Sequence, residues 1–216
     1  MTKGDCFIGV DVGAPKKGFD VAVYRDGAIE SFHKFKGGNQ VPALVEMIHS
    51  LGSKVVAIDS PQNWAPVEKS RPCERAFVKM GICGIRFTPN RRTADSSSNG
   101  YYGWIFNGMK LWEALDPAAS KGAKVIEVFP TAAWTVWFES RGTRRRAAWS
   151  ERCLKGLDIE LPEVRRNQDK RDAVAAALTA CEYSNGEAEA VSDGDDRHPN
   201  SAESGIVLPS KSRGSS

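Results

Sequence analysis

Two acidic side chains stand at the ends of apolar runs, where an unpaired carboxylate is costly to bury. Asp11 closes the run at 6–11, and Asp59 closes the run at 54–59. Asp172 enters an apolar helix of small residues much later in the chain. A buried charge needs a partner, and clustered carboxylates repel one another unless cations lie between them. Because magnesium prefers oxygen ligands, the sequence predicts that Asp11, Asp59 and Asp172 bind Mg²⁺ or Mn²⁺ and take part in catalysis.

Each acid also has a structural explanation that the sequence leaves open. Asp11 could accept hydrogen bonds in the turn that follows it, although its position after a buried run favours a ligand. Asp59 could equally begin a turn. We expect Asp169 to cap the helix that contains Asp172, and to have no part in metal binding. Glu127 lies inside a buried strand and needs either a metal or an arginine as partner, so we include it among the catalytic candidates.

The apolar runs predict the elements that would bring these acids together. Strands at 6–11, 18–24 and 29–35 should form a meander, because an Asp-Gly pair between two such runs is a strong hairpin signal. Further strands are expected at 54–59, 124–129 and 205–209, the last of them at an edge of the sheet. Helices are expected at 41–51, 67–80, 101–115, 131–139, the second half of 141–154 and 167–183. Loops are expected at 82–100 and 185–204.

This order predicts an α/β fold of the RNase H-like class. Its mixed sheet consists of a three-stranded antiparallel meander plus parallel strands, and helices flank it. In such a sheet the first and fourth strands are neighbours, and the last long helix crosses them. Asp11, Asp59 and Asp172 should therefore converge.

Length and composition indicate an ordinary globular protein. We expect one RNase H-like domain over 1–209, with a mostly helical insertion at about 60–122 and a disordered tail at 210–216. The five cysteines form no Cys-x-x-Cys pair and no secretory segment precedes them, which predicts reduced thiols in a cytoplasmic protein. No apolar run approaches the roughly 20 residues of a membrane span. The oligomeric state stays open.

Basic and aromatic residues suggest how a phosphate substrate would be held. The net charge of +3 is too small to predict a nucleic-acid partner by itself. Arg91 and Arg92 flank a polar loop at 82–100, which we expect to be mobile and next to the site. We assign these two arginines and Arg71 to substrate binding, although a solvated basic face is the alternative. Four tryptophans could stack on bases, namely Trp104, Trp112, Trp134 and Trp137. We expect most of them to pack in the core instead.

Short motifs along the chain resemble those of the domain of unknown function 429 family. They are Ile-Gly-Val-Asp at 8–11, Ala-Ile-Asp-Ser-Pro at 57–61, Arg-Pro-Cys-Glu at 71–74, Val-Ile-Glu-Val-Phe-Pro at 125–130 and Asp-Lys-Arg-Asp followed by small residues at 169–177, and the end at 205–209 is similar as well. That family is described as predicted nucleases of RNase H fold, so the resemblance implies this fold and activity. Glu74 departs from the aspartate expected at its position, and we leave it out of the site.

The leading hypothesis is a hydrolase, namely a divalent-metal-dependent nuclease or phosphodiesterase that acts through a carboxylate cluster. Its partner would be nucleic acid or another phosphodiester, and the sequence does not separate DNA, RNA and small substrates. The first alternative is a nucleotide-binding phosphotransferase of the actin/sugar-kinase type, because such proteins also begin with a Gly-x-Asp-x-Gly strand and turn. The chain is short for that class. The second alternative is a catalytically silent binding module on the same fold.

Overall fold

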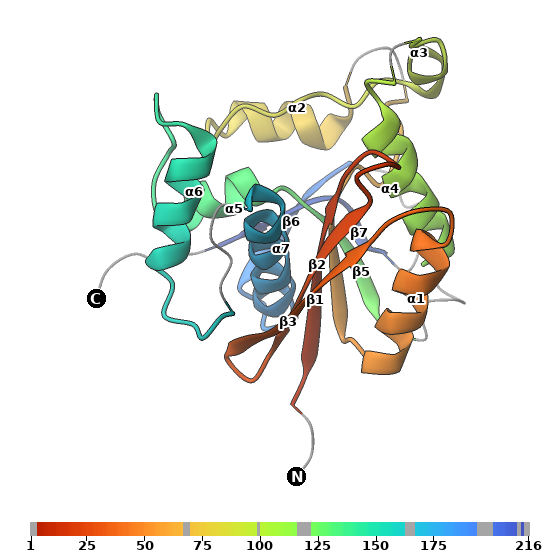
Figure 1. The fold of residues 1–216 in the computed structure, drawn as a ribbon. Coiled ribbons are helices and arrows are strands. Elements are labelled where there is room, and N and C mark those ends of the chain that lie inside the picture. Colours follow the sequence, from red (N-terminus) through yellow and green to blue (C-terminus); the bar gives the residue numbers. More distant parts are fainter. Residues whose placement is uncertain are drawn as a thin grey trace.

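A computed structural model describes residues 4–66, 70–98, 100–115, 122–162, 167–193, 201–210 and 213. Its strands form one sheet in the order β3-β2-β1-β4-β5-β7-β6 (Figure 1). The strands are β1 (Cys6–Val12), β2 (Phe19–Arg25), β3 (Ala28–Phe35), β4 (Val55–Asp59), β5 (Lys124–Val128), β6 (Ala188–Ser192) and β7 (Ser201–Pro209). The helices are α1 (Gln40–Leu51), α2 (Pro72–Lys79), α3 (Arg91–Asp95), α4 (Gly103–Ala114), α5 (Pro130–Trp137), α6 (Arg146–Lys155) and α7 (Gln168–Ser184).

The first three strands form the expected antiparallel meander. Asp26 and Gly27 connect β2 to β3 with positive φ angles of 50° and 85°, the backbone that a tight hairpin turn requires. β4 then pairs in parallel with β1, and β5 and β7 continue the parallel part of the sheet. The predicted RNase H-like class is therefore confirmed, with a mixed sheet that helices flank.

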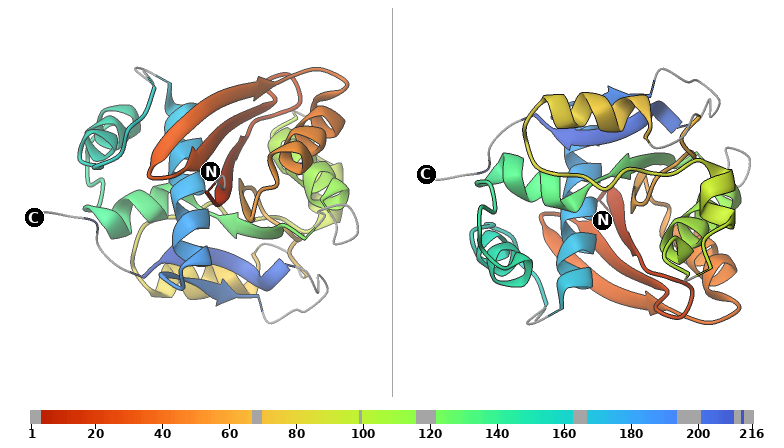
Figure 2. Two further views of the ribbon diagram at one scale, coloured as in Figure 1. Left: turned by 90° about the horizontal axis from the view of Figure 1, so that it is seen from below. Right: turned by 90° about the horizontal axis from the view of Figure 1, so that it is seen from above.

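Helices cover the two faces of the sheet separately (Figure 2). α7 crosses one face and contacts β1, β2 and β4, with α5 and α6 beside it. On the other face α1 and α4 pack against the sheet. Leu44 and Ile48, one turn apart on α1, belong to the core cluster on that face together with Val10 and Ile58. This arrangement leaves the carboxyl ends of β1 and β4 open between the two helical layers.

Small residues allow α7 to lie directly on β1. A Cβ atom added at Gly9 would lie 2.1 Å from the carbonyl oxygen of Ala173 and 2.2 Å from the backbone nitrogen of Ala177. The backbone of α7 therefore lies directly against the backbone of β1 at Gly9, and a side chain at position 9 would push the two apart. This close contact sets how near the first turns of α7 come to Asp11.

Gly9→Ala should destabilise the protein, because the added methyl group must push α7 away from β1. Overpacking of a well-filled core costs about 1–3 kcal/mol, and the backbone contacts here leave little room for relaxation. Urea denaturation of the variant and the wild type would measure the difference. Gly38→Ala is the control, since a Cβ atom there meets nothing within 4 Å. Equal midpoints for Gly9→Ala and Gly38→Ala would contradict the close packing.

Two expectations for the later part of the sheet were wrong. The segment 185–204, predicted to be a loop, contains β6 and the start of β7. β7 was expected at the edge but lies between β5 and β6, so β6 is the edge strand. β6 is short and half exposed, as is usual for an edge strand. Its polar residues gave its sequence the composition of a loop.

The helical segments also differ from expectation in detail. The loop predicted at 82–100 contains the short helix α3, whose N-cap Asn90 accepts a hydrogen bond of 2.8 Å from the backbone of Thr93. α2, α3 and α4 lie within the segment 60–122, and their description as an insertion in a single domain stays a prediction. No helix in the described part of the chain has both the length and the apolar character needed to cross a membrane.

Part of the predicted disordered tail packs against the domain. The backbone nitrogen of Arg213 donates a 3.0 Å hydrogen bond to the carbonyl of Trp137, and its side chain forms an ion pair with Glu182. Its guanidinium lies over the ring of Trp137. Residues 211–212 and 214–216 lie outside the described residues, so the expectation of disorder there stays a prediction.

Candidate functional site

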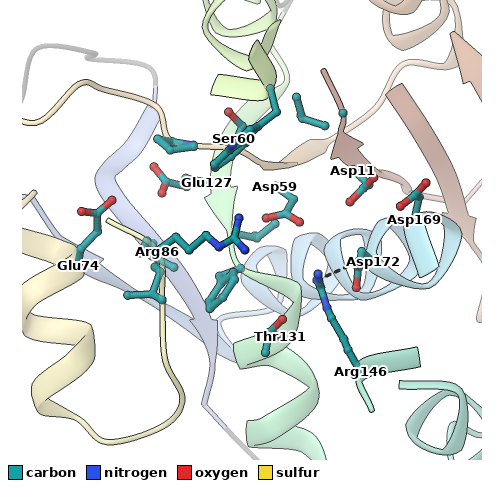
Figure 3. Close-up of a pocket in the computed structure, with 18 of the residues that line it drawn as sticks. Asp11, Asp59, Ser60, Glu74, Arg86, Glu127, Thr131, Arg146, Asp169 and Asp172 are labelled. Carbon is teal, nitrogen blue, oxygen red and sulfur yellow. Dashed lines mark hydrogen bonds and ion pairs between the residues drawn. The ribbon is translucent and has the colours of Figure 1, made fainter. Parts of the chain in front are cut away.

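A cavity of about 730 Å³ opens at the carboxyl ends of the central strands (Figure 3). Asp11 near the end of β1, Asp59 at the end of β4 and Glu127 near the end of β5 line it. Asp169 and Asp172 enter it from the first turns of α7. The carboxyl ends of parallel strands are the usual place for ligands in α/β sheets.

Strand register explains why Asp11 and Asp59 lie side by side, and it adds Asp20 of β2, which does not line the cavity. Asp11 pairs with Asp59 across the parallel β1–β4 ladder and with Asp20 across the antiparallel β1–β2 ladder. Residues paired in this way point to the same face of a sheet. That face also carries Gly9, two residues before Asp11, and is the face that α7 covers. Carboxylate oxygens of Asp11, Asp20 and Asp169 all lie within 4.8 Å of one another.

Burial and mutual repulsion raise the pKa values of the acids in the cavity. Burial has the largest effect on the Asp11 carboxyl, and the nearby charges of Asp59, Asp172 and Asp169 raise its pKa further. The pKa of Asp59 rises to about 8, first through burial and then through Asp172. Burial also raises the pKa of Asp172 to about 6, although Arg146 opposes that shift.

Basic side chains neutralise only part of this charge. Lys17 pairs with Asp169 at 2.7 Å, Arg146 pairs with Asp172 at 2.9 Å, and Lys34 pairs with Asp20. Within the residues that the structure describes, no hydrogen bond or ion pair engages the carboxylate of Asp11 or Asp59. The excess of oxygen donors and negative charge fits a hard divalent cation such as Mg²⁺ or Mn²⁺.

The structure thus brings Asp11, Asp59 and Asp172 into one cavity, and a shared metal ion stays a prediction. Asp169 joins them, and among the described residues the close carboxylate group consists of Asp11, Asp20 and Asp169, without Asp59 or Asp172. The sequence interpretation missed both Asp20 and Asp169. The N-cap of α7 is Asn167, whose side chain accepts a 3.1 Å hydrogen bond from the backbone of Lys170. Asp169 is therefore free of the capping role that we expected. Its spacing of three residues from Asp172, which puts both on one helix face, was the available signal.

Glu127 has an arginine partner. Arg71 donates to both of its carboxylate oxygens, at 2.7 Å for the Nη1–Oε2 pair, and the backbone of Gln62 donates at 2.8 Å. Across β4 and β5, Glu127 pairs with Ile58 and not with Asp59, so alternation points its side chain to the face opposite Asp59. The choice between metal and arginine is thereby resolved, and a catalytic role for Glu127 stays a prediction.

Arg71 belongs to the wall of the cavity. Its side chain is 1% exposed, and besides Glu127 it bonds Glu74 at 3.2 Å and Asp193 at 3.3 Å. Each guanidinium nitrogen is therefore engaged by at least one carboxylate of the cavity wall. Glu74, which we left out of the site, also accepts from the backbone of Thr88. These contacts give Arg71 a structural role in the cavity wall, and substrate binding by Arg71 stays a prediction.

Arg91 and Arg92 are exposed and do not belong to the described lining of the cavity. Arg91 pairs with Asp95 at 2.9 Å and lies over the rings of Trp64 and Phe106. This packing argues against a freely moving Arg91, and substrate binding by either arginine stays a prediction. The cations that line the cavity besides Arg71 are Lys17, Arg86, Arg141 and Arg146.

The tryptophans also separate into two groups. Trp112, Trp134 and Trp137 are buried in the core, as expected for most of them. Trp104 is partly exposed and lines the cavity. It is the member of the set that is placed to meet a ligand.

The raised pKa of Asp59 predicts how stability depends on pH without metal. The folded protein holds a proton on Asp59 up to about pH 8, whereas the unfolded chain releases it near the ordinary pKa of 3.8. Stability that is present below pH 4 should therefore fall as the pH rises to 8, by up to about 1.4 kcal/mol per unit. Asp59→Asn should flatten this slope in urea titrations with EDTA at several pH values.

Asp5→Asn is the matched control, because Asp5 is an exposed acid that pairs with Lys54 on the surface. It should keep the wild-type slope. A slope for Asp59→Asn equal to that of wild type would show that Asp59 carries no proton in the folded protein near neutral pH.

Comparisons with known proteins bear on the fold and the family. The Thermus thermophilus RuvC structure matches with 16% identity and a TM-score of 0.45, over 84% of this chain and 96% of that chain. The structure of T. thermophilus RuvC in complex with Holliday junction substrate matches over the same shares, with 16% identity and a TM-score of 0.44. A search among curated proteins gave no significant match. The profile described as "Protein of unknown function (DUF429)" matches residues 9–197, so the chain belongs to the DUF429 family.

Proposed function

We propose that the protein is a divalent-metal-dependent nuclease that cleaves phosphodiester bonds in its acidic cavity. The observation that carries this proposal is the meeting of Asp11, Asp59, Asp169 and Asp172 in one cavity that basic side chains only partly neutralise. Buried acids with raised pKa values cluster at functional sites. Glu127 is paired with Arg71, whereas no hydrogen bond or ion pair among the described residues engages the carboxylates of Asp11 and Asp59.

The cavity has one group of residues for the metal and another for the phosphates of the substrate. Asp11, Asp20 and Asp169 would hold the metal, because their carboxylate oxygens lie within 4.8 Å of one another, with Asp59 and Asp172 as further oxygen donors in the cavity. A bound divalent ion would activate the attacking water and stabilise the leaving oxygen. Arg86, on the opposite side of the cavity, would bind a phosphate next to the one that is cleaved, because guanidinium groups match phosphate oxygens in geometry and charge.

Arg146 has a place in the same scheme. It pairs with the buried carboxylate of Asp172, while its own side chain is 42% exposed and lines the cavity within reach of a bound phosphate. When a metal takes the charge of Asp172, the arginine becomes available to the substrate. The cavity therefore contains both an anionic part for the cation and a cationic part for the phosphate.

A cleavage assay with purified protein tests the proposal. Labelled single-stranded, duplex and branched DNA and RNA would be incubated with Mg²⁺, Mn²⁺ or EDTA. We expect cleavage of at least one substrate with metal and none with EDTA. Parallel titrations with the metals and with ATP separate the alternatives. Dependence on ATP would indicate a phosphotransferase, and an absence of binding by either metal would overturn the metal-dependent nuclease in favour of a silent module.

A further inference from the structure

Two exposed aromatic rings lie on the connection between α2 and α4, which also carries Arg86 of the cavity lining. Of the side chains that the structure describes, the large hydrophobic ones with high exposure are Val78, Met80, Phe87 and Tyr101. Phe87 is 47% exposed and Tyr101 is 50% exposed. Rings of this size bury much apolar area when they are covered, so their exposure next to a polar cavity points to a ligand.

Arg86 links these rings to the cavity. Its side chain reaches the cavity from the side opposite Asp11 and Asp169 (Figure 3). Its guanidinium carbon lies 5.9 Å from the centre of the Tyr101 ring, and Phe87 is its neighbour in the chain. Trp104, three residues after Tyr101, lines the cavity itself. We refer to Phe87, Tyr101 and Trp104 as the aromatic rim.

Buried contacts hold the segment of Phe87 in place. The connection that carries Phe87 crosses the molecule between α2 and α3 in an extended conformation (Figure 2). Thr88, the next residue, is buried and bonds Glu74 through both its backbone and its hydroxyl group. Pro89 accepts a 3.1 Å hydrogen bond from the backbone of Ala65. A ring on such an anchored segment loses little conformational freedom when it binds a ligand.

The charges around the rim select the class of ligand. Arg86, Arg141 and Arg146 line the same cavity and suit the phosphates of a polynucleotide backbone. Flat bases suit the rings, and each stacked base contributes substantially to the affinity for any sequence. Only unpaired bases can stack in this way, because a duplex keeps the faces of its bases covered. A small phosphodiester would reach the acids and Trp104 but neither Phe87 nor Tyr101, which do not belong to the cavity lining.

We propose that the aromatic rim stacks unpaired bases next to the phosphodiester in the cavity, so that the substrate is a single-stranded or branched nucleic acid. This inference rests on the proposed function for the identity of the cavity. It makes Phe87 and Tyr101 specificity-determining residues, and it assigns to Arg86 a position between the base and the phosphate.

Binding measurements in EDTA test the rim without any cleavage. The probes are a fluorescently labelled single-stranded DNA of about 12 nucleotides, within the site sizes typical of such proteins, and the same strand with abasic central positions. Fluorescence anisotropy should show that wild type prefers the strand with bases by about 10-fold or more, as expected from one or two stacked bases. Phe87→Ala and Tyr101→Ala should lose most of this preference and bind the abasic strand as wild type does.

Two control variants sharpen the result. Met80→Ala removes a side chain that is 54% exposed but does not line the cavity, and it should bind both strands like wild type. Phe87→Trp keeps a stacking ring and should retain the preference for bases. Melting curves would verify that each variant is folded. The comparison of the two DNA strands on the wild-type protein tests the rim even if a variant does not fold.

The outcomes separate the rim from the proposed activity. Equal affinity of wild type for both strands, or unchanged affinity in Phe87→Ala and Tyr101→Ala, would overturn the stacking role and leave the rim as a surface for a protein partner. Tighter binding of duplex than of the single strand would also overturn it. A preference for bases without any metal-dependent cleavage would support the rim as a nucleic-acid site and reject the nuclease.

Discussion

Asp11→Asn should abolish metal-dependent cleavage while the fold stays intact. The amide keeps the shape of the side chain but removes the charge that holds the cation, and loss of a ligand should weaken metal binding by at least about 100-fold, the upper end of the effect of outer-shell partners. Asp11 lies in the middle of the acidic cavity, where Asp59, Asp169 and Asp172 all raise its pKa. The metal-free variant should therefore be as stable as wild type or more stable, because repulsion in the cavity falls.

Melting curves with and without Mg²⁺ or Mn²⁺ would measure this effect beside the cleavage assay. At a metal concentration of 100 times the dissociation constant, wild type should gain about 2.7 kcal/mol of stability. A 100-fold weaker site would gain only about 0.4 kcal/mol at the same concentration.

Asp5→Asn, on the surface, should keep the full metal-induced gain and serves as the control. If Asp11 only serves the turn that follows it, the amide can still accept a hydrogen bond and little should change. Equal metal-induced shifts in wild type and Asp11→Asn would remove Asp11 from the site.

The sequence was sufficient for Asp11 and Asp59 among the acids that the sheet positions, but not for Asp20, which pairs with Asp11 from β2. Asp11 and Asp59 end buried strands, and the order of strands made those strands neighbours, so their meeting follows from topology. The small residues of α7 gave the same kind of information, since an alanine-rich helix can lie close to a strand that contains Gly9. The periodicity of apolar residues and the order of strands determine which distant segments pack together, and both can be read from the sequence.

Other parts of the site depend on contacts that carry no local pattern. Arg71 and Glu127 are 56 positions apart in the chain, and nothing near either residue identifies the other as its partner. Several polar residues stand at the start of α7, and any of them could have been its N-cap. The choice of Asn167 left Asp169 to face the cavity. Such choices are decided by tertiary packing, because each local alternative is nearly equal in free energy.

Arg71→Met should destabilise the protein more than any change on its surface. The substitution fills a similar volume but removes the cation that faces Glu127, Glu74 and Asp193. Breaking a buried ion pair by removing one partner costs about 3–5 kcal/mol, because the remaining charge is left without compensation. Here three acids lose the same partner, and the walls formed by β5, α2 and the residue after β6 would separate.

Urea denaturation of Arg71→Met beside Arg91→Met would test this expectation. Arg91 forms an exposed ion pair with Asp95, so its loss should cost less than about 1 kcal/mol. The double variant Arg71→Met/Glu127→Gln should recover part of the stability that Arg71→Met loses, because the amide carries no charge that needs compensation. A loss for Arg71→Met no larger than that for Arg91→Met would show that the acids around Arg71 are held by other contacts.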